Sequence, residues 1–486
     1  MVISSLDTFI VGIYIAGMLL IGIYVSRGIK SFVDFALAGR LLTTPLLAGT
    51  FISTYYGLDV TFGSSETAYL EGMSTFFVYS LPFYVCYLAV AILIVPRIFK
   101  LNASTIPETI TRLYGTGARI PTILATVFYS LPIISVAGLG ILGHFFFGID
   151  PLVAAFLGAT IAAFYTFFGG LLADVLTDSI QFFIMCITLS SAAFFAMTEI
   201  GSMDQLKLSL APEFFEPLGT LSIADIIVYT VIALTPLVEP AFYQRIFASR
   251  SAKAATQALL LSTVIWTAFD WIVVYLGIVG KFMVTQGTLP ASLDESEIIL
   301  HITANLLPSG LLGLFIAGCV ATAMSTVDSY SLIAASSVVY DGFHFYKKNG
   351  LTDKQLIQYT RVGIIISIAL SLLISYQFER IRDAWIFMAS ILVSALLVPL
   401  MAGFLLKNPG KRSGTYSIWA GFFSAAVIFI LLETVGSYDP VHETQIFSLP
   451  EYEILFQREH LLFVAVPLSI AAFIIGYLQD LKGRRI

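Results

Sequence analysis

The chain has 486 residues, of which 58% are hydrophobic and only 12% are charged. Soluble domains carry about 25% charged residues, so this composition excludes an ordinary soluble protein. The formal net charge of −6 says little about partners, because the charges lie between long apolar runs. Such runs recur from end to end, which predicts an all-α polytopic membrane protein in a lipid bilayer rather than a barrel.

The apolar runs predict about thirteen transmembrane helices in one membrane domain, 1–486. They lie near residues 5–26, 43–71, 75–97, 120–146, 150–169, 177–200, 222–244, 255–284, 308–341, 357–378, 384–406, 415–436 and 461–479. The first run has no basic residue before it, and Arg27 and Lys30 follow it. Because a signal peptide has the reverse order, we expect a retained helix.

The basic residues predict the orientation. With the N-terminus outside, 20 of the 25 basic residues, Arg245 among them, fall in or beside cytoplasmic segments. The positive-inside rule therefore predicts a multi-pass protein of the cell (inner) membrane with a cytoplasmic C-terminus. Residues 103–115 predict a short inner helix, with Ser104 or Thr105 as its cap and Pro107 in its first turn. The acidic, aromatic segment 434–460 is expected over the outer face.

Two of the predicted spans carry helix-breaking residues at their centres. The second span holds Gly57 and Asp59, and the seventh holds Pro236 and Pro240. Breaks at membrane depth are tolerated where freed carbonyls meet protein, water or an ion. Because the breaks are five spans apart, they indicate inverted repeats over 43–200 and 222–406, flanked by an extra helix in 1–30 and two helices in 415–486. The alternative is a pair of kinks without a site.

The ninth span concentrates hydroxyls on one helix face. Thr322, Ser325, Thr326 and Ser329 recur at i, i+3, i+4 and i+7, and Asp328 borders that face. Oxygen ligands of this kind suit a hard cation such as sodium. The alternative is that the hydroxyls bond back to carbonyls of their own helix.

Other candidate chemistry is weak. Cys86, Cys186 and Cys319 lie inside predicted spans without metal-ligand spacing, which is typical of small buried hydrophobes. The five histidines are scattered, and no nucleophile–histidine pair occurs. The sequence therefore predicts neither an enzyme nor a nucleic-acid partner.

Several segments resemble the sodium:solute symporter family. They are "ATAMSTVDS" (321–329), "GGLLADVLTDSIQ" (169–181), "FYQRIFASRSAKAA" (242–255) and "AGTFIS" (48–53). The resemblance implies the five-plus-five inverted-repeat fold of the leucine-transporter type. It also implies sodium-coupled symport, in which a small organic solute is imported by alternating access and no obligatory protein partner is needed.

The resemblance implies three sets of site residues. The main sodium site would use Gly49, Ile52, Thr322, Ser325 and Thr326, the first three through backbone carbonyls. A second sodium would use Ser325 together with Asp178, Asp328 and Ser329. The solute would lie beside Ser53, Tyr56 and Tyr79, with Tyr55 and Glu239 as neighbours to test.

Parts of this assignment have open alternatives. Asp328 stands where the sialic-acid transporter has a serine, and Asp178 would also serve as an N-terminal cap of the sixth helix with Gln181. No arginine or lysine is expected at the depth of the solute pocket, while acids within spans favour an amine or a neutral polyol. A proton-coupled carrier using Asp178 or Asp328 is the main alternative function, and a channel or a membrane-embedded enzyme is a weaker one.

Overall fold

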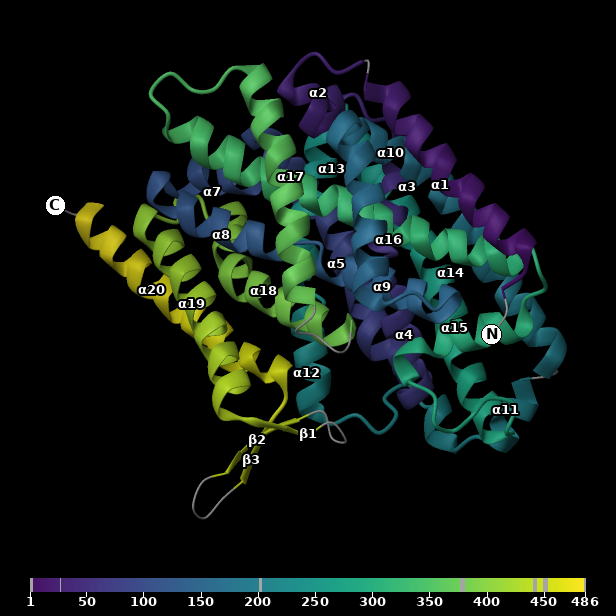
Figure 1. Cartoon of the computed structure of the whole chain (residues 1–486). Helices are drawn as coiled ribbons and strands as arrows, with labels where there is room; N and C mark the ends of the chain where they lie inside the picture. Colours follow the sequence, from purple (N-terminus) through teal and green to yellow (C-terminus); the bar gives the residue numbers. More distant parts are fainter. Residues whose placement is uncertain are drawn as a thin grey trace.

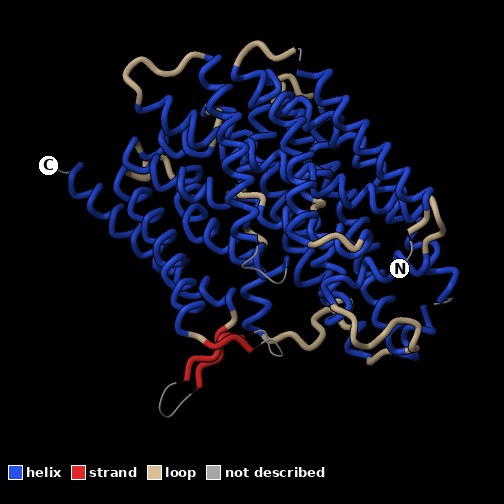
Figure 2. The backbone as a smooth tube through the Cα atoms, viewed as in Figure 1, coloured by secondary structure: helices blue, strands red, loops and turns tan. Residues whose placement is uncertain are grey.

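The computed structural model describes residues 3–26, 28–200, 203–375, 381–439, 444–448 and 453–484, and Arg27 therefore lies outside the described residues. Figure 2 shows that the described chain is almost entirely helical. The α-helices are α1 Ser5–Ser26, α2 Phe32–Leu37, α3 Thr44–Tyr55, α4 Leu58–Glu71, α5 Leu81–Ala89, α6 Val95–Leu101, α7 Ile106–Tyr114, α8 Arg119–Tyr129, α9 Ile133–Phe147, α10 Pro151–Ile200, α11 Met203–Ser209, α12 Ile223–Ile232, α13 Pro240–Ala248, α14 Ala252–Thr285, α15 Ile298–Leu306, α16 Leu311–Ser336, α17 Asp353–Ser375, α18 Ile381–Leu405, α19 Lys411–Val435 and α20 Leu462–Arg484. Shorter 3-10 or π-helical turns are η1 Ala38–Arg40, η2 Thr75–Ser80, η3 Val90–Ile94, η4 Thr116–Ala118, η5 Pro212–Phe215, η6 Thr235–Leu237, η7 Glu295–Glu297, η8 Ser337–His344 and η9 Arg458–Leu461.

The helices match the predicted spans. In the described chain, 11 helical segments are long and apolar enough to cross a membrane, and each coincides with one predicted span. The second predicted span is divided into α3 and α4, and the fifth is the first part of α10, whose apolar stretch Pro151–Phe164 is shorter. The polytopic helical fold is confirmed, whereas the count of thirteen and the inverted repeat stay predictions.

The break in the second span lies at Tyr56 and Gly57. Tyr56 leaves helical geometry at φ −88° and ψ 57°, and Gly57 is extended at ψ 178° before α4 begins. An added Cβ on Gly57 would lie 2.0 Å from a carboxylate oxygen of Asp59. Only glycine therefore leaves room for the Asp59 side chain to fold back over the break, and the predicted interruption is confirmed.

The seventh span is also interrupted as predicted. Helix α12 ends at Ile232, the short turn η6 holds Pro236, and α13 begins at Pro240. Proline suits the first position of a helix because it has no amide hydrogen to leave unpaired. The two proline positions therefore end one half-helix and start the next.

Helix α10 differs from the prediction, because it continues through the expected gap between the fifth and sixth spans. Its kink lies at Gly170, with φ 55° and ψ −156°, and an added Cβ there would lie 2.3 Å from the Phe35 carbonyl oxygen. Glycine alone tolerates both the dihedral and the close approach. Asp178 consequently lies inside α10, so its interpretation as an N-terminal cap with Gln181 is wrong.

Two peripheral predictions can be compared with the structure. Thr105 caps α7, since its hydroxyl accepts a hydrogen bond of 3.0 Å from the Glu108 amide, as expected for the inner helix. The segment 434–460 forms a small antiparallel sheet that was not predicted. Its strands are β1 Ser437–Asp439, β2 Thr444–Ser448 and β3 Glu453–Phe456, and Ser437 faces Ile446 while Ile446 also faces Leu455.

The arrangement places three helices at the centre. Figure 1 shows α18, α19 and α20 along one side of the bundle and α1 along the other. Between them, α10 packs against both α3 and α16, and α3 also packs against α16. Because α16 is the most buried of the membrane-length helices, the polar residues of these three helices meet in the interior.

Candidate functional site

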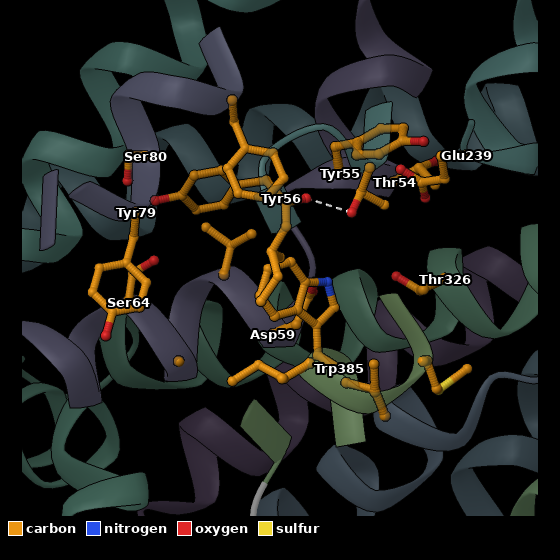
Figure 3. Close-up of a pocket in the computed structure, with 18 of the residues that line it drawn as sticks. Thr54, Tyr55, Tyr56, Asp59, Ser64, Tyr79, Ser80, Glu239, Thr326 and Trp385 are labelled. Atoms are coloured by element: carbon orange, nitrogen blue, oxygen red, sulfur yellow. Dashed lines mark hydrogen bonds between the residues drawn. The ribbon is translucent and has the colours of Figure 1, made fainter. Parts of the chain in front are cut away.

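A cavity of about 150 Å³ lies beside both interrupted helices (Figure 3). Its walls come from the α3–α4 break, the α12–α13 break and helices α5, α14, α16 and α18, together with the turn between α8 and α9. Four residues predicted for the solute line it, namely Tyr55, Tyr56, Tyr79 and Glu239. The broken helices therefore enclose a solute-sized space rather than a packed kink.

Ser53, the fifth residue predicted for the solute, is not part of this lining. It is fully buried, and its hydroxyl donates to the Gln181 Oε1 at 3.2 Å. Gln181 in turn donates to the Tyr14 hydroxyl at 3.0 Å. Ser53 thus connects α3 with α10 and α1 on the side away from the cavity.

The hydroxyl face of α16 reaches the cavity through Thr326. Its hydroxyl donates to the Thr322 carbonyl at 3.1 Å, and the Thr322 hydroxyl donates to the Gly318 carbonyl at 2.9 Å. These are the bonds within one helix that the sequence analysis left as an alternative. A hydroxyl oxygen that donates keeps two lone pairs, so both oxygens remain able to ligate a cation.

The facing wall comes from the end of α3. An added Cβ on Gly49 would lie 3.0 Å from the Ser179 hydroxyl oxygen, so α3 and α10 approach closely at this glycine. The Ile52 carbonyl accepts from the Tyr56 amide at 2.9 Å, in the last turn before the break. Gly49 therefore lies beside α10, and both predicted carbonyl ligands belong to the last two turns of the half-helix.

Asp178 joins the three central helices. Its carboxylate accepts from the Thr50 hydroxyl of α3 and from the Ser325 hydroxyl of α16. It is fully buried, as are Asp328 and Ser329. Two members of the predicted second sodium set, Asp178 and Ser325, are therefore in direct contact.

The other two members of that set behave differently. The Ser329 hydroxyl donates to a carboxylate oxygen of Asp174 at 2.6 Å. Both carboxylate oxygens of Asp328 are buried and have no hydrogen-bond partner among the described residues. Asp174 was not among the predicted site residues, although Asp174 and Asp178 lie four apart in an apolar segment and so share one helix face.

A buried arginine lies among these groups, which corrects the expectation of no basic residue at this depth. Arg245 of α13 is 0% exposed. Its Nη2 lies 2.7 Å from the Ser329 hydroxyl, 3.4 Å from Asp174 and 3.6 Å from Asp178. Its guanidinium also donates to the hydroxyl of Thr54, a residue of the cavity wall. Because Arg245 lies near the end of a predicted span, the sequence indicated a cytoplasmic position, but its side chain points to the buried acids of α10.

Two further acids of the cavity accept hydrogen bonds from tyrosines. The Tyr330 hydroxyl donates to Glu239, and the Tyr84 hydroxyl donates to Asp270. Both tyrosines line the cavity, and neither was predicted. Tyrosines are common in apolar spans, so the sequence carries no signal that separates these two from packing residues.

Comparison with known proteins agrees with this geometry. The family model "Sodium:solute symporter family" matches residues 35–421. The osmoregulated proline transporter OpuE of Bacillus subtilis is 24% identical over 90% of this chain and 97% of its own length. The high-affinity choline transporter 1 of Drosophila melanogaster is 25% identical over 90% of this chain and 72% of its own length. The sodium/glucose cotransporter of Vibrio parahaemolyticus is 24% identical over 92% and 88%.

The fold has a close structural counterpart. A Na⁺-coupled sialic acid symporter in a substrate-bound outward-open state superposes with a TM-score of 0.81 at 17% identity, covering 98% of each chain. The family model spans most of the sequence, and the relatives match over most of their length. The chain therefore belongs to the sodium:solute symporter family and is a sodium-coupled symporter of a small solute.

Proposed function

We propose that sodium binds between the end of α3 and the middle of α16. Its ligands are the carbonyls of Gly49, Ile52 and Thr322 and the hydroxyls of Ser325 and Thr326. Five neutral oxygens suit a monovalent hard cation, and α10 holds the two helices together through Asp178. Binding at this position links the broken helix to its neighbour.

One observation carries the coupling of ion and solute. Thr326 belongs to the proposed sodium ligands and also lines the cavity, beside Thr54 and Tyr55 of the broken helix. Sodium that orders this wall also shapes the solute site, so each cargo raises the affinity for the other by the same factor. Tyr55, Tyr56, Tyr79 and Glu239 are the proposed solute contacts, while Ser53 keeps α3 on α10.

A second sodium is less favoured by the geometry. The guanidinium of Arg245 already contacts Ser329 at 2.7 Å and lies 3.6 Å from Asp178. A fixed cation at this place repels a second one and compensates the carboxylates that would bind it. We therefore infer that one sodium is carried in each cycle and that Arg245 takes the place of the second ion.

A specific observation favours a second candidate, namely coupling to protons. The buried carboxylate of Asp328 has no hydrogen-bond partner among the described residues. Because no described group bonds to this carboxylate, Asp328 is the proposed proton carrier in that case. Solute uptake at one fixed pH with and without sodium separates the two candidates.

The proposed orientation follows from charge. With most basic residues in the cytoplasm, the N-terminus lies outside the cell membrane and the C-terminus inside. The cavity is lined by α4 beyond the break, by α12 and by residues near the start of α18. In this orientation it lies in the outer half of the membrane and receives solute from outside.

The test removes the two hydroxyl ligands in the variant Ser325→Ala/Thr326→Ala. Purified wild-type protein should be stabilised against heat by NaCl relative to KCl, since a ligand that binds the folded state raises its stability. The double variant should lose this difference and lose sodium-stimulated uptake in vesicles while remaining folded. Ser336→Ala is the matched control, because Ser336 is a buried serine of α16 whose hydroxyl donates to the Leu332 carbonyl at 2.6 Å. A double variant that keeps the sodium effect contradicts the proposed site.

A further inference from the structure

The side chains around the cavity indicate the chemical class of the solute, an inference that rests on the proposed function because it takes this cavity as the solute site. Eight tyrosines, two tryptophans and one phenylalanine line the cavity. Three acids, Asp59, Glu239 and Asp270, share the lining, and within the described ranges no lysine, arginine or histidine does. The wall is therefore aromatic and carries only negative ionisable groups.

The acids of this wall have no cationic partner among the described residues. Glu239 is 2% exposed and Asp270 is 6% exposed, and each accepts a hydrogen bond from a tyrosine hydroxyl, that of Tyr330 or Tyr84. The second oxygen of Asp270 has no partner in the part of the chain that the structure describes. Buried carboxylates are costly unless a positive charge accompanies them.

The nearest buried cation does not supply that charge. Arg245 does not line the cavity, and its guanidinium donates to the hydroxyl of Thr54 in the cavity wall. Its guanidinium lies 3.4 Å from Asp174 and 3.6 Å from Asp178, so two carboxylates on α10 already offset its charge. No described cation therefore accompanies Glu239, and a cationic ligand would supply the missing charge.

The aromatic rings stand in a geometry suited to a cation. The Trp266 ring centroid lies 4.6 Å from that of Tyr87 and 5.7 Å from that of Tyr55, and the Tyr55 and Trp266 planes meet at 70°. On the side of α16, Tyr129 and Tyr330 lie 5.9 Å apart. Of these pairs only Tyr55 and Trp266 meet at a steep angle, so the rings form a packed aromatic cluster beside the cavity. An ammonium group is attracted to the faces of aromatic rings.

We propose that the solute is a small organic cation, an ammonium compound whose charged head lies between Glu239 and the rings of Tyr55, Tyr87 and Trp266. An apolar cavity of about 150 Å³ admits a benzene-sized molecule, so the solute is compact. An anionic solute finds no basic partner in this lining. A sugar would stack on the rings but would leave the acids without a countercharge.

The test compares ammonium probes with a neutral isostere that differs from choline in charge alone, and with solutes of other classes. The ammonium probes are ethanolamine, dimethylethanolamine and choline, and the neutral isostere of choline is 3,3-dimethylbutanol, in which carbon replaces nitrogen. Glycine betaine adds a carboxylate to the same head, and proline and glucose represent a zwitterion and a polyol. Thermal stabilisation of the purified full chain is measured with each probe in NaCl and in KCl.

We expect at least one ammonium probe to stabilise the protein in NaCl and the neutral isostere to have no effect. In Glu239→Gln the affinity for that ammonium probe should fall about tenfold or more, while stabilisation by sodium alone is kept. Glu66→Gln is the matched control, since Glu66 is a buried acid of α4 that does not line the cavity.

The outcomes separate this inference from the proposed function. The cationic-solute proposal is overturned if betaine, proline or glucose binds while no ammonium probe does. It is also overturned if the neutral isostere binds as well as choline. Neither outcome contradicts the sodium site. Failure of the whole ammonium panel overturns the cationic-solute proposal as well. Absence of any difference between NaCl and KCl contradicts the sodium site itself.

Discussion

Replacing Arg245 with methionine tests the arrangement at the centre of the protein. Methionine has a similar length but no charge, so Arg245→Met leaves Asp174 and Asp178 buried without a cation. Removing one partner of a buried ion pair costs about 3–5 kcal/mol. Because two carboxylates lose their partner here, at 3.4 Å and 3.6 Å, we expect a loss of this size in the free energy of unfolding.

The assay is equilibrium unfolding of the purified protein in detergent micelles, with Arg361→Met as the control. The Arg361 guanidinium donates to the backbone carbonyl of Phe167 at 2.7 Å and has no carboxylate partner among the described residues. Losing a hydrogen bond to a charged group costs about 1.5–3 kcal/mol, so the control should be less damaging. In the double variant Arg245→Met/Asp174→Asn one orphaned charge is gone, and part of the lost stability should return.

Sodium titration of the same variants gives a second readout. If the guanidinium takes the place of a second ion, the wild-type titration fits one site, and Arg245→Met gains a second sodium-dependent step because Asp178 and Asp174 are free to bind it. Wild-type stability in Arg245→Met would refute the reasoning about charge compensation. Two sodium sites in the wild type, unchanged in the variant, would refute the proposed replacement of the ion.

Two further predictions concern groups near the membrane surface. Asp341→Ala should lower the free energy of unfolding by about 3–5 kcal/mol, because Arg119 loses a buried carboxylate at 2.8 Å. The same unfolding assay measures this loss. The control is Glu108→Ala, whose pair with Arg112 is more exposed, and an equal loss in the control would contradict the prediction. The hydroxyl of Ser31 holds the pKa of Asp34 below its usual value, so this cap of α2 is intact above the ordinary pKa and is lost as the pH falls through the lowered one. The protection factors of the α2 amides, which correct for the pH dependence of intrinsic exchange, should fall only below that ordinary pKa, and a fall above it would contradict the assignment.

The sequence predicts the membrane helices well because hydropathy depends on each residue alone. Apolar runs located the helical segments, and the glycine and proline positions located both interruptions, since a broken helix needs residues without a Cβ or without an amide hydrogen. The same local reasoning failed at α10. The α10 helix continues because Gly170 bends it around the Phe35 carbonyl, and that contact joins residues far apart in the sequence.

Pairings between polar residues were much harder to predict. The hydroxyl face of α16 followed from helical spacing, but the partners of Ser325 and Ser329 are Asp178 and Asp174 on another helix. Arg245 was assigned to the cytoplasm because it lies near the end of a span. Nothing local in the sequence shows that its side chain turns inward to those acids.

The strongest missed signal was a matter of charge balance. Asp174 and Asp178 lie four residues apart in an apolar segment, and two acids on one buried face require a cation. That requirement has two solutions, a mobile ion or a fixed side chain, and a fixed side chain was not predicted. The same requirement holds for Glu239 and Asp270, where the described residues supply no fixed cation. Arg245 compensates Asp174 and Asp178, which therefore have a structural role. Glu239 and Asp270 face the cavity instead, so a bound solute is the group that can compensate them. This difference is the reason for expecting a cationic solute.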